Sequence, residues 1–322
     1  MSCGFSRESC LVLVANPTAA RYRHFAGRRE GRSSFSFVLH VLTIHWQSDV
    51  WIEPQLRYLA RFAPTETRVW ACLNGVDDAY RSRFSVAVDL EGSHPQKLNQ
   101  LADLVLAEAA PDDHLLFIDG DAFPVRPVEP LLADPTPLIA ARRAENFGDP
   151  QPHPCFCITT ARLWREIDGD WSRGYKWKNS LGLMVTDPGA NLMENLRGRD
   201  IAWRPLDRVN TVNLHPLWFA LYGDAEYGPV VYHHGAGFRG RVGRVDTMTG
   251  GFAFETQALR GPTWVPGLRR VERHLRGRAS AHRRARWERQ ELPRQEQLAD
   301  EVFQAIVSDE DIVARFAQPD HM

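Results

Sequence analysis

The sequence predicts an α/β fold: a mixed, mostly parallel sheet flanked by helices, with a helical C-terminal extension. Two observations indicate this class. Apolar runs typical of strands alternate with helical patterns in the order β-α-β-β-α-β, which is the order of a mainly parallel sheet. One of these runs, at residues 115–118, is apolar throughout, as strands are when both faces of their sheet are covered.

The composition is that of an ordinary globular protein. Of the 322 residues, 43% are hydrophobic and 25% are charged, and the formal net charge is −1. This charge gives no reason to expect a nucleic acid as partner. The five cysteines have no framework spacing, which argues against a disulfide scaffold, and no apolar run is long enough to span a membrane. We therefore expect a cytoplasmic protein.

Residues 1–34 are expected to be a disordered extension, because their second half is rich in Arg, Gly and Ser and has no apolar period. The first strand is predicted at 37–44, where branched residues dominate. A helix with one apolar face follows and ends at Pro64. These elements open the predicted main domain, residues 35–262.

The next elements lead to an acidic motif. Strands are predicted at 67–73 and 84–90, and the first of them ends at the turn residue Asn74. A helix is predicted at 94–110 from its apolar period, and it precedes the strand at 115–118. The sheet is thereby expected to present several strand ends along one edge.

The strand at 115–118 runs directly into Asp119-Gly120-Asp121. Open α/β sheets bind their ligands beyond the carboxyl ends of the strands. Two carboxylates this close repel each other unless a cation lies between them. Oxygen ligands suit Mg²⁺ or Mn²⁺, and such an ion usually reaches the diphosphate of a bound nucleotide. An isolated D-x-D tripeptide is more often a surface turn, but its place after a buried strand favours a metal site.

The second half of the chain continues the alternation of strands and helices. Strands are predicted at 138–141, 154–159, 201–206 and 230–231, with helices at 161–167 and after Asp187. Residues 263–322 are predicted to form a charged helical tail. Its Arg-rich part, 269–289, is expected to be solvated, and a peripheral membrane contact is the alternative.

In this setting the D-x-D motif resembles the nucleotide-sugar glycosyltransferases of the GT-A fold, over about residues 37–245. The helix after Asp187 and the strand-end histidines match the family in layout, although the usual paired Glu-Asp is absent. The resemblance implies a Rossmann-type, GT-A-like sheet. It also implies a metal-dependent enzyme that moves a sugar from a nucleotide-diphosphate donor to an acceptor hydroxyl.

The resemblance assigns roles to particular residues. Asp121 would coordinate Mn²⁺ or Mg²⁺ directly, and Asp119 would bind the metal through water or bind donor hydroxyls. A histidine after the late strand would complete the site. Consecutive strand residues face opposite ways, so only one of His233 and His234 can point into the cleft, and we favour His234.

Asp187 is the candidate general base, which would take the proton from the acceptor hydroxyl and would imply inversion. An N-cap role explains it as well, since Pro188 follows at a typical first helical position. Donor contacts are expected at the strand ends, on the helix before the motif and in the closing loop: Thr43, His45, Asn74, Asp89, Lys97, Asp119 and Arg239.

Three alternatives remain. A nucleotidyltransferase would favour a Gly-rich basic loop after the first strand, where His45-Trp46-Gln47-Ser48 stands. A haloacid-type phosphatase also ends a strand in D-x-D, but it requires Thr or Val where Phe123 stands. The third is a non-catalytic sugar-binding or scaffold protein on a decayed transferase fold.

Overall fold

The computed structural model describes residues 37–144, 148–179, 184–210, 219–235 and 292–316. The first half of the chain forms β1 (Leu39–Trp46), α1 (Ile52–Phe62), β2 (Thr67–Asn74), the 3₁₀ helix η1 (Asp78–Arg83), β3 (Val86–Val88), α2 (His94–Leu106), β4 (His114–Asp119), β5 (Ala122–Pro124) and α3 (Glu129–Leu132). The second half forms β6 (Leu138–Arg142), β7 (Pro152–Thr160), α4 (Ala161–Glu166), β8 (Trp177–Lys178), β9 (Met184–Val185), α5 (Ala190–Gly198), β10 (Arg204–Arg208), β11 (Ala220–Asp224), β12 (Gly228–His233), α8 (Leu292–Val307) and α9 (Ile312–Phe316).

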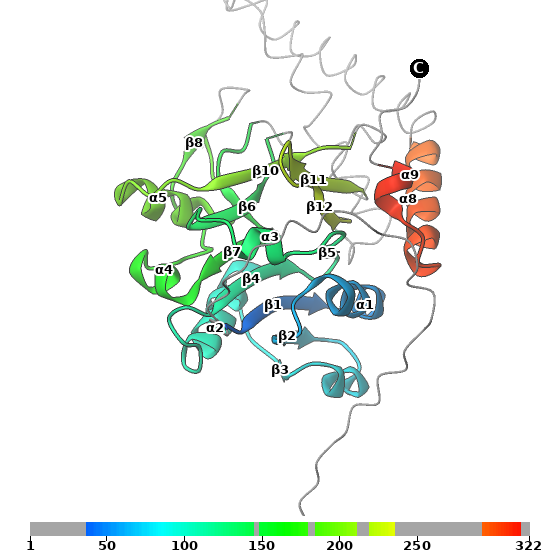
Figure 1. Cartoon of the computed structure of the whole chain (residues 1–322), viewed down its shortest axis with the longest axis horizontal. Coiled ribbons are helices and arrows are strands. Elements are labelled where there is room, and N and C mark those ends of the chain that lie inside the picture. Colours follow the sequence, from blue (N-terminus) through cyan, green and yellow to red (C-terminus); the bar gives the residue numbers. More distant parts are fainter. Residues whose placement is uncertain (1–36, 145–147, 180–183, 211–218, 236–291, 317–322) are drawn as a thin grey trace, which may run out of the picture. The chain divides into compact units, whose positions relative to one another are not determined.

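Ten of these strands form one sheet in the order β3-β2-β1-β4-β7-β6-β10-β11-β12-β5 (Figure 1). The pairs β3–β2, β2–β1, β1–β4 and β6–β10 are parallel. Only β7, β11 and β5 run against the other strands of this sheet. The predicted mixed, mostly parallel sheet is therefore confirmed.

The sheet has a topological switch point between β1 and β4. After β1 the chain builds β2 and β3 on one side, and it then crosses back to place β4 on the other side of β1. The carboxyl ends of β1 and β4 consequently diverge into separate connections. Such a point is where open α/β sheets form a ligand crevice.

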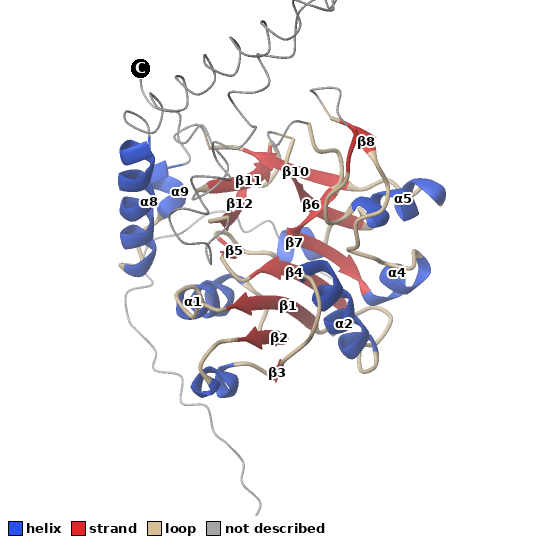
Figure 2. Ribbon diagram, turned by 180° about the vertical axis from the view of Figure 1, so that it is seen from behind, coloured by secondary structure: helices blue, strands red, loops and turns tan. Residues whose placement is uncertain are grey.

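Helices cover both faces of the sheet (Figure 2). On one face, α2, α4 and α5 bury residues such as Leu101, Trp164 and Leu196 against Phe117 of β4. On the other face, α1 and α3 pack against the alternate strand residues, among them Ile118. The strand at 115–118 is apolar throughout because both of its faces are buried in this way.

The short strand β5 was not predicted, because Pro124 suggested a turn. β5 pairs antiparallel with β12, and the register places His233 opposite Ala122. Proline is tolerated there because β5 is the edge strand of the sheet. This pairing brings the end of β12 next to the acidic motif.

The C-terminal helices α8 and α9 belong to the folded core. Val302, Ile306 and Phe316 are buried in an apolar cluster that also contains Trp51 and Tyr232. The Arg-rich residues 269–289, on which the prediction of a solvated tail rests, lie outside the described residues, as do residues 1–34. No helix in the described part of the chain combines the length and apolar character needed to cross a membrane.

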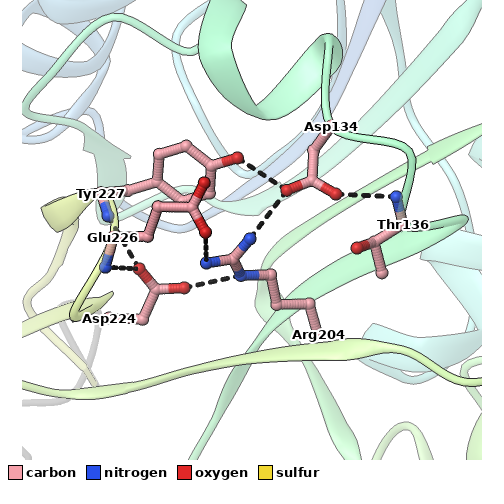
Figure 3. Close-up of polar contacts among 6 residues, drawn as sticks. All are labelled: Asp134, Thr136, Arg204, Asp224, Glu226 and Tyr227. Carbon is pink, nitrogen blue, oxygen red and sulfur yellow. Dashed lines mark hydrogen bonds and ion pairs between the residues drawn. The ribbon is translucent and has the colours of Figure 1, made fainter.

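Arg204 at the start of β10 connects the loop after α3 with the turn between β11 and β12 (Figure 3). The Arg204 guanidinium donates to Asp134 at 2.8 Å, to Asp224 at 2.7 Å and to Glu226 at 2.6 Å. The Tyr227 hydroxyl also donates to Asp134, at 2.6 Å. Burial opposes the charge on Asp134, but hydrogen bonds from Thr136 and Tyr227 and the charge of Arg204 lower its pKa to about 2.

Candidate metal centre

Three side chains that could hold a metal meet at the carboxyl edge of the sheet. Nε2 of His233 lies 3.4 Å from Oδ2 of Asp119 and 3.5 Å from Oδ1 of Asp121. One ligand atom from each residue lies within 4.8 Å of the other two. Asp119 ends β4, Asp121 comes two residues later and His233 ends β12, so pairing of β12 with β5 assembles a site from distant segments.

The backbone around the motif explains its central glycine. A Cβ atom on Gly120 would lie 2.3 Å from the carbonyl oxygen of Ile44 and 2.9 Å from Nδ1 of His45. Only glycine lets the motif approach β1 this closely. On the other side, the His234 N–H donates to the Asp121 carbonyl at 3.0 Å, which holds the motif against β12.

A second histidine, His94, was not predicted to belong to the site. Its Nε2 lies 3.3 Å from Oδ1 of Asp119, and it opens α2 directly after the capping residue Ser93. A helix that follows a parallel strand begins at the carboxyl edge of the sheet. That position was the signal for His94 in the sequence. His94 thus contacts one carboxylate oxygen of Asp119, Oδ1, and His233 faces the other, Oδ2.

The electrostatics of the cluster favour a cation between the carboxylates. Burial opposes the charge on Asp119, but hydrogen bonds from His233 and His94 hold its pKa well below the usual range. Burial also lowers the pKa of His233, whereas Cys155, Asp119 and Asp121 raise it, and the net pKa lies well above the ordinary value. The two carboxylates thus stabilise positive charge at this point, as a metal site requires.

The structure brings His233, rather than His234, to the aspartates. The His234 ring lies 4.6 Å from the Trp51 ring, and its Nδ1 lies 3.0 Å from the Tyr232 hydroxyl. Neighbouring strand residues do face opposite ways, as predicted. The choice between them depended on the register with β5, which had not been predicted.

Thr43 and His45, predicted to contact the donor, are buried beneath the motif instead. Both side chains lie 3.1 Å from Oε1 of Gln55 on α1. The Gln55 amide donates in turn to the carbonyls of Asp119 and Ala122, at 2.8 and 2.7 Å. Burial lowers the pKa of His45 to about 4, so this ring is neutral at physiological pH. In the described structure Thr43 and His45 thus support, through Gln55, the main chain that carries the two aspartates.

Asn74 and Lys97 meet at the ends of β1 and β2. The Lys97 ammonium donates to Oδ1 of Asn74 at 2.7 Å and lies 3.9 Å from the ring centroid of Trp46. Trp46 is 40% exposed, whereas Lys97 is only 3% exposed, so the Trp46 ring is the part of this group that is open to a ligand. Asp89 is paired with Arg81 at the end of β3, and Arg239 lies outside the described residues.

Asp187 does not cap α5. The N-cap is Gly189, with a φ of 87°, and the helix begins at Ala190, so the alternative role of Asp187 is wrong. Its partly buried carboxylate lies 3.6 Å from Arg173 instead. Burial raises the pKa of Asp187, against the opposing charges of Arg143 and Arg173. Nη1 of Arg143 also lies 3.3 Å from Nε2 of His153.

Comparisons with known proteins give matches among solved structures. No family model matches the chain, and no curated protein sequence matches it. The chain is similar to a mannosyltransferase from Pyrobaculum calidifontis solved with GDP-Man and Mn²⁺, at 14% identity and a TM-score of 0.39, over 85% of this chain and 81% of that chain.

Two further matches are also glycosyltransferases or carry a nucleotide sugar. GlyE of Streptococcus pneumoniae is 12% identical with a TM-score of 0.35, over 53% of this chain and 45% of that chain. S. aureus TarS, solved with UDP-GlcNAc, is 15% identical with a TM-score of 0.32, over 48% and 56%. The chain spans less than half the length of several matched structures, with coverages of 35%, 30% and 45%. The chemistry of the site therefore has to follow from its own residues.

Proposed function

We propose that this protein is a metal-dependent glycosyltransferase, which moves a sugar from a nucleotide-diphosphate donor to a hydroxyl-bearing acceptor. The observation that carries the proposal is the cluster of Asp119, Asp121 and His233 beside the switch point of the sheet. Two carboxylates and an imidazole suit Mn²⁺, or Mg²⁺ with water completing its shell. The place of the cluster is where a nucleotide is expected to bind.

When bound, a divalent cation would supply positive charge that stabilises the negative charge developing on the leaving diphosphate. Asp119, Asp121 and His233 hold it, and His233 replaces the His234 of our prediction. His94 orients Asp119 through the contact at Oδ1. Lys97 and Asn74, beside the exposed Trp46 ring, are proposed to bind the nucleotide.

Asp187 is proposed to accept the proton of the acceptor hydroxyl. Burial raises its pKa against the opposing charges of Arg143 and Arg173, which makes its carboxylate a stronger base than an ordinary aspartate. A base on the side opposite the leaving diphosphate implies inversion at the anomeric carbon. We expect Asp187→Asn to lower turnover by about 100-fold or more, with the Kd of the donor unchanged.

The first test is thermal unfolding with and without Mn²⁺, in the presence of GDP-Man, UDP-GlcNAc, and TDP- and CDP-sugars. A ligand that binds only the folded state raises the unfolding midpoint. We expect one donor class to raise it in a metal-dependent way in the wild type and not in Asp121→Asn. The matched control is Asp112→Asn, since Asp112 is an exposed aspartate paired with Arg162. Absence of a shift with every donor would refute the proposal.

Product analysis separates the proposed reaction from its alternatives. A glycosyltransferase glycosylates an added acceptor and thereby releases the nucleoside diphosphate from its donor, whereas a nucleotidyltransferase exchanges pyrophosphate. Metal-dependent binding with no release of diphosphate under any condition would instead indicate a sugar-binding protein. The Asp187→Asn variant serves as the negative control, because it is expected to retain the donor.

A further inference from the structure

Gln151, directly before β7, has an unusual environment. Gln151 is only 1% exposed, and neither Nε2 nor Oε1 of its side chain has a hydrogen-bond partner among the described residues. Buried amides in native proteins are nearly always paired, because an unpaired one loses its hydration without compensation. Groups of this kind are retained at functional sites, where a ligand supplies the missing partners.

Gln151 lies between the two parts of the candidate site. Two residues further along, the His153 ring lies 6.1 Å from the ring of His233. In the other direction, Cγ of Gln151 lies 3.5 Å from the position that a Cβ on Gly189 would occupy. The loop that carries Asp187 therefore rests on Gln151, while the same segment leads to the metal centre.

The same contacts show that this packing is tight. A Cβ on Gly189 would lie only 2.1 Å from the carbonyl oxygen of Pro152, and the positive φ of Gly189 also favours glycine. The loop after Asp187 is thus held closely against the start of β7. The Gln151 side chain is consequently packed at Cγ against the loop that follows Asp187, and a group that reads a substrate needs such fixed support.

We infer that Gln151 binds hydroxyl groups of the donor sugar and so helps to select that sugar. The inference rests on the proposed function, in which the sugar lies between the diphosphate at the metal and the base Asp187. A carboxamide offers N–H donors and a carbonyl acceptor side by side, which matches neighbouring hydroxyls of a pyranose. The sugar supplies the partners that the amide lacks in the protein alone.

The test is Gln151→Met, which keeps the length of the side chain and removes its polar atoms. Kd values are measured with Mn²⁺ for two pairs of ligands, GDP-Man with GDP and UDP-GlcNAc with UDP. For the pair that the wild type binds, we expect the variant to bind the nucleotide sugar about 3- to 10-fold more weakly, with the nucleoside diphosphate unchanged. We also expect the unfolding midpoint of the ligand-free variant to rise by about 2 °C or more, because an unpaired buried amide is removed.

Two matched substitutions show what the same change does elsewhere. Gln100→Met, at an exposed position of α2, should alter neither Kd nor the midpoint. Gln55→Met should lower the midpoint, because the Gln55 amide is fully paired. An unchanged ratio of sugar-nucleotide to diphosphate Kd in Gln151→Met, or a lower midpoint, overturns the inference alone. If the wild type binds neither pair, the same comparison is made with TDP- and CDP-sugars and their nucleoside diphosphates, and absence of binding to all four classes overturns the proposed function and the inference with it.

Discussion

Mild acid should destabilise this fold, and the buried neutral ring of His45 should contribute a measurable part of the loss. Burial lowers the pKa of His45 to about 4, against its hydrogen bond to Gln55, whereas the unfolded chain has the ordinary value of 6.5. Between these two values the unfolded state binds a proton that the folded state excludes. Stability therefore falls as the pH drops from about 6.5 to about 4.

The size of the effect follows from the two pKa values. At pH 5 the unfolded histidine is almost fully protonated and the folded one is mostly neutral. With about 1.4 kcal/mol for each pKa unit, the folded state has by then lost about 2 kcal/mol relative to neutral pH. This is a large part of the stability of an ordinary domain.

The assay is urea unfolding of the wild type and of His45→Gln at pH 7.5 and pH 5.0. A glutamine amide can still donate to Gln55 but does not titrate, so the variant should lose about 2 kcal/mol less than the wild type between these pH values. Other groups, including the buried His40 and His153, titrate in both proteins and cancel in the difference. Equal losses in the two proteins would show that His45 is not held neutral, and the buried support role would be refuted.

Three further outcomes are expected. Because the pKa of Asp134 lies at about 2, the wild type should lose about 1 kcal/mol more than Asp134→Asn between pH 5 and pH 3, measured by urea unfolding; equal losses would contradict this. Gly120→Ala should weaken Mn²⁺ binding at least about 10-fold in calorimetry, since its Cβ would lie 2.3 Å from the Ile44 carbonyl; an unchanged Kd would show that the motif tolerates the shift. Ile306→Ala should cost about 2–5 kcal/mol of unfolding free energy, whereas the exposed neighbour in Val307→Ala should cost little; similar costs would place α8 outside the core.

Much of the fold followed from local patterns in the sequence. Apolar runs and helical periods predicted the order of β1, α1, β2, β3, α2 and β4, because both signals arise within single segments. The short strand β5 could not be predicted in this way. It is three residues long and contains Pro124, and it is a strand only because β12 pairs with it. Pairing of this kind is a long-range property that no local window contains.

In the candidate site, too, residues marked by a local pattern were predicted and residues defined by long-range contacts were not. Asp119 and Asp121 were found because a buried strand leads directly into them. His94 was missed although its place at the start of α2 was a signal for the carboxyl edge of the sheet, and Gln151 was missed because its missing partners are visible only in the structure. The predicted helix start at Pro188 moved to Ala190 because the contact of Gly189 with Pro152 decides where the loop ends. A tertiary contact prevailed over a good local capping signal.

The position of α8 and α9 has a consequence for how the protein forms during synthesis. Trp51 precedes Phe303 by 252 residues, yet the centroids of the two rings lie 5.3 Å apart. At ordinary translation rates the two are made roughly 10–50 s apart. The apolar cluster around Trp51 and Tyr58 is therefore exposed on the ribosome until α8 emerges. Chaperones that bind nascent chains would find their target at this surface rather than at the acidic edge of the sheet.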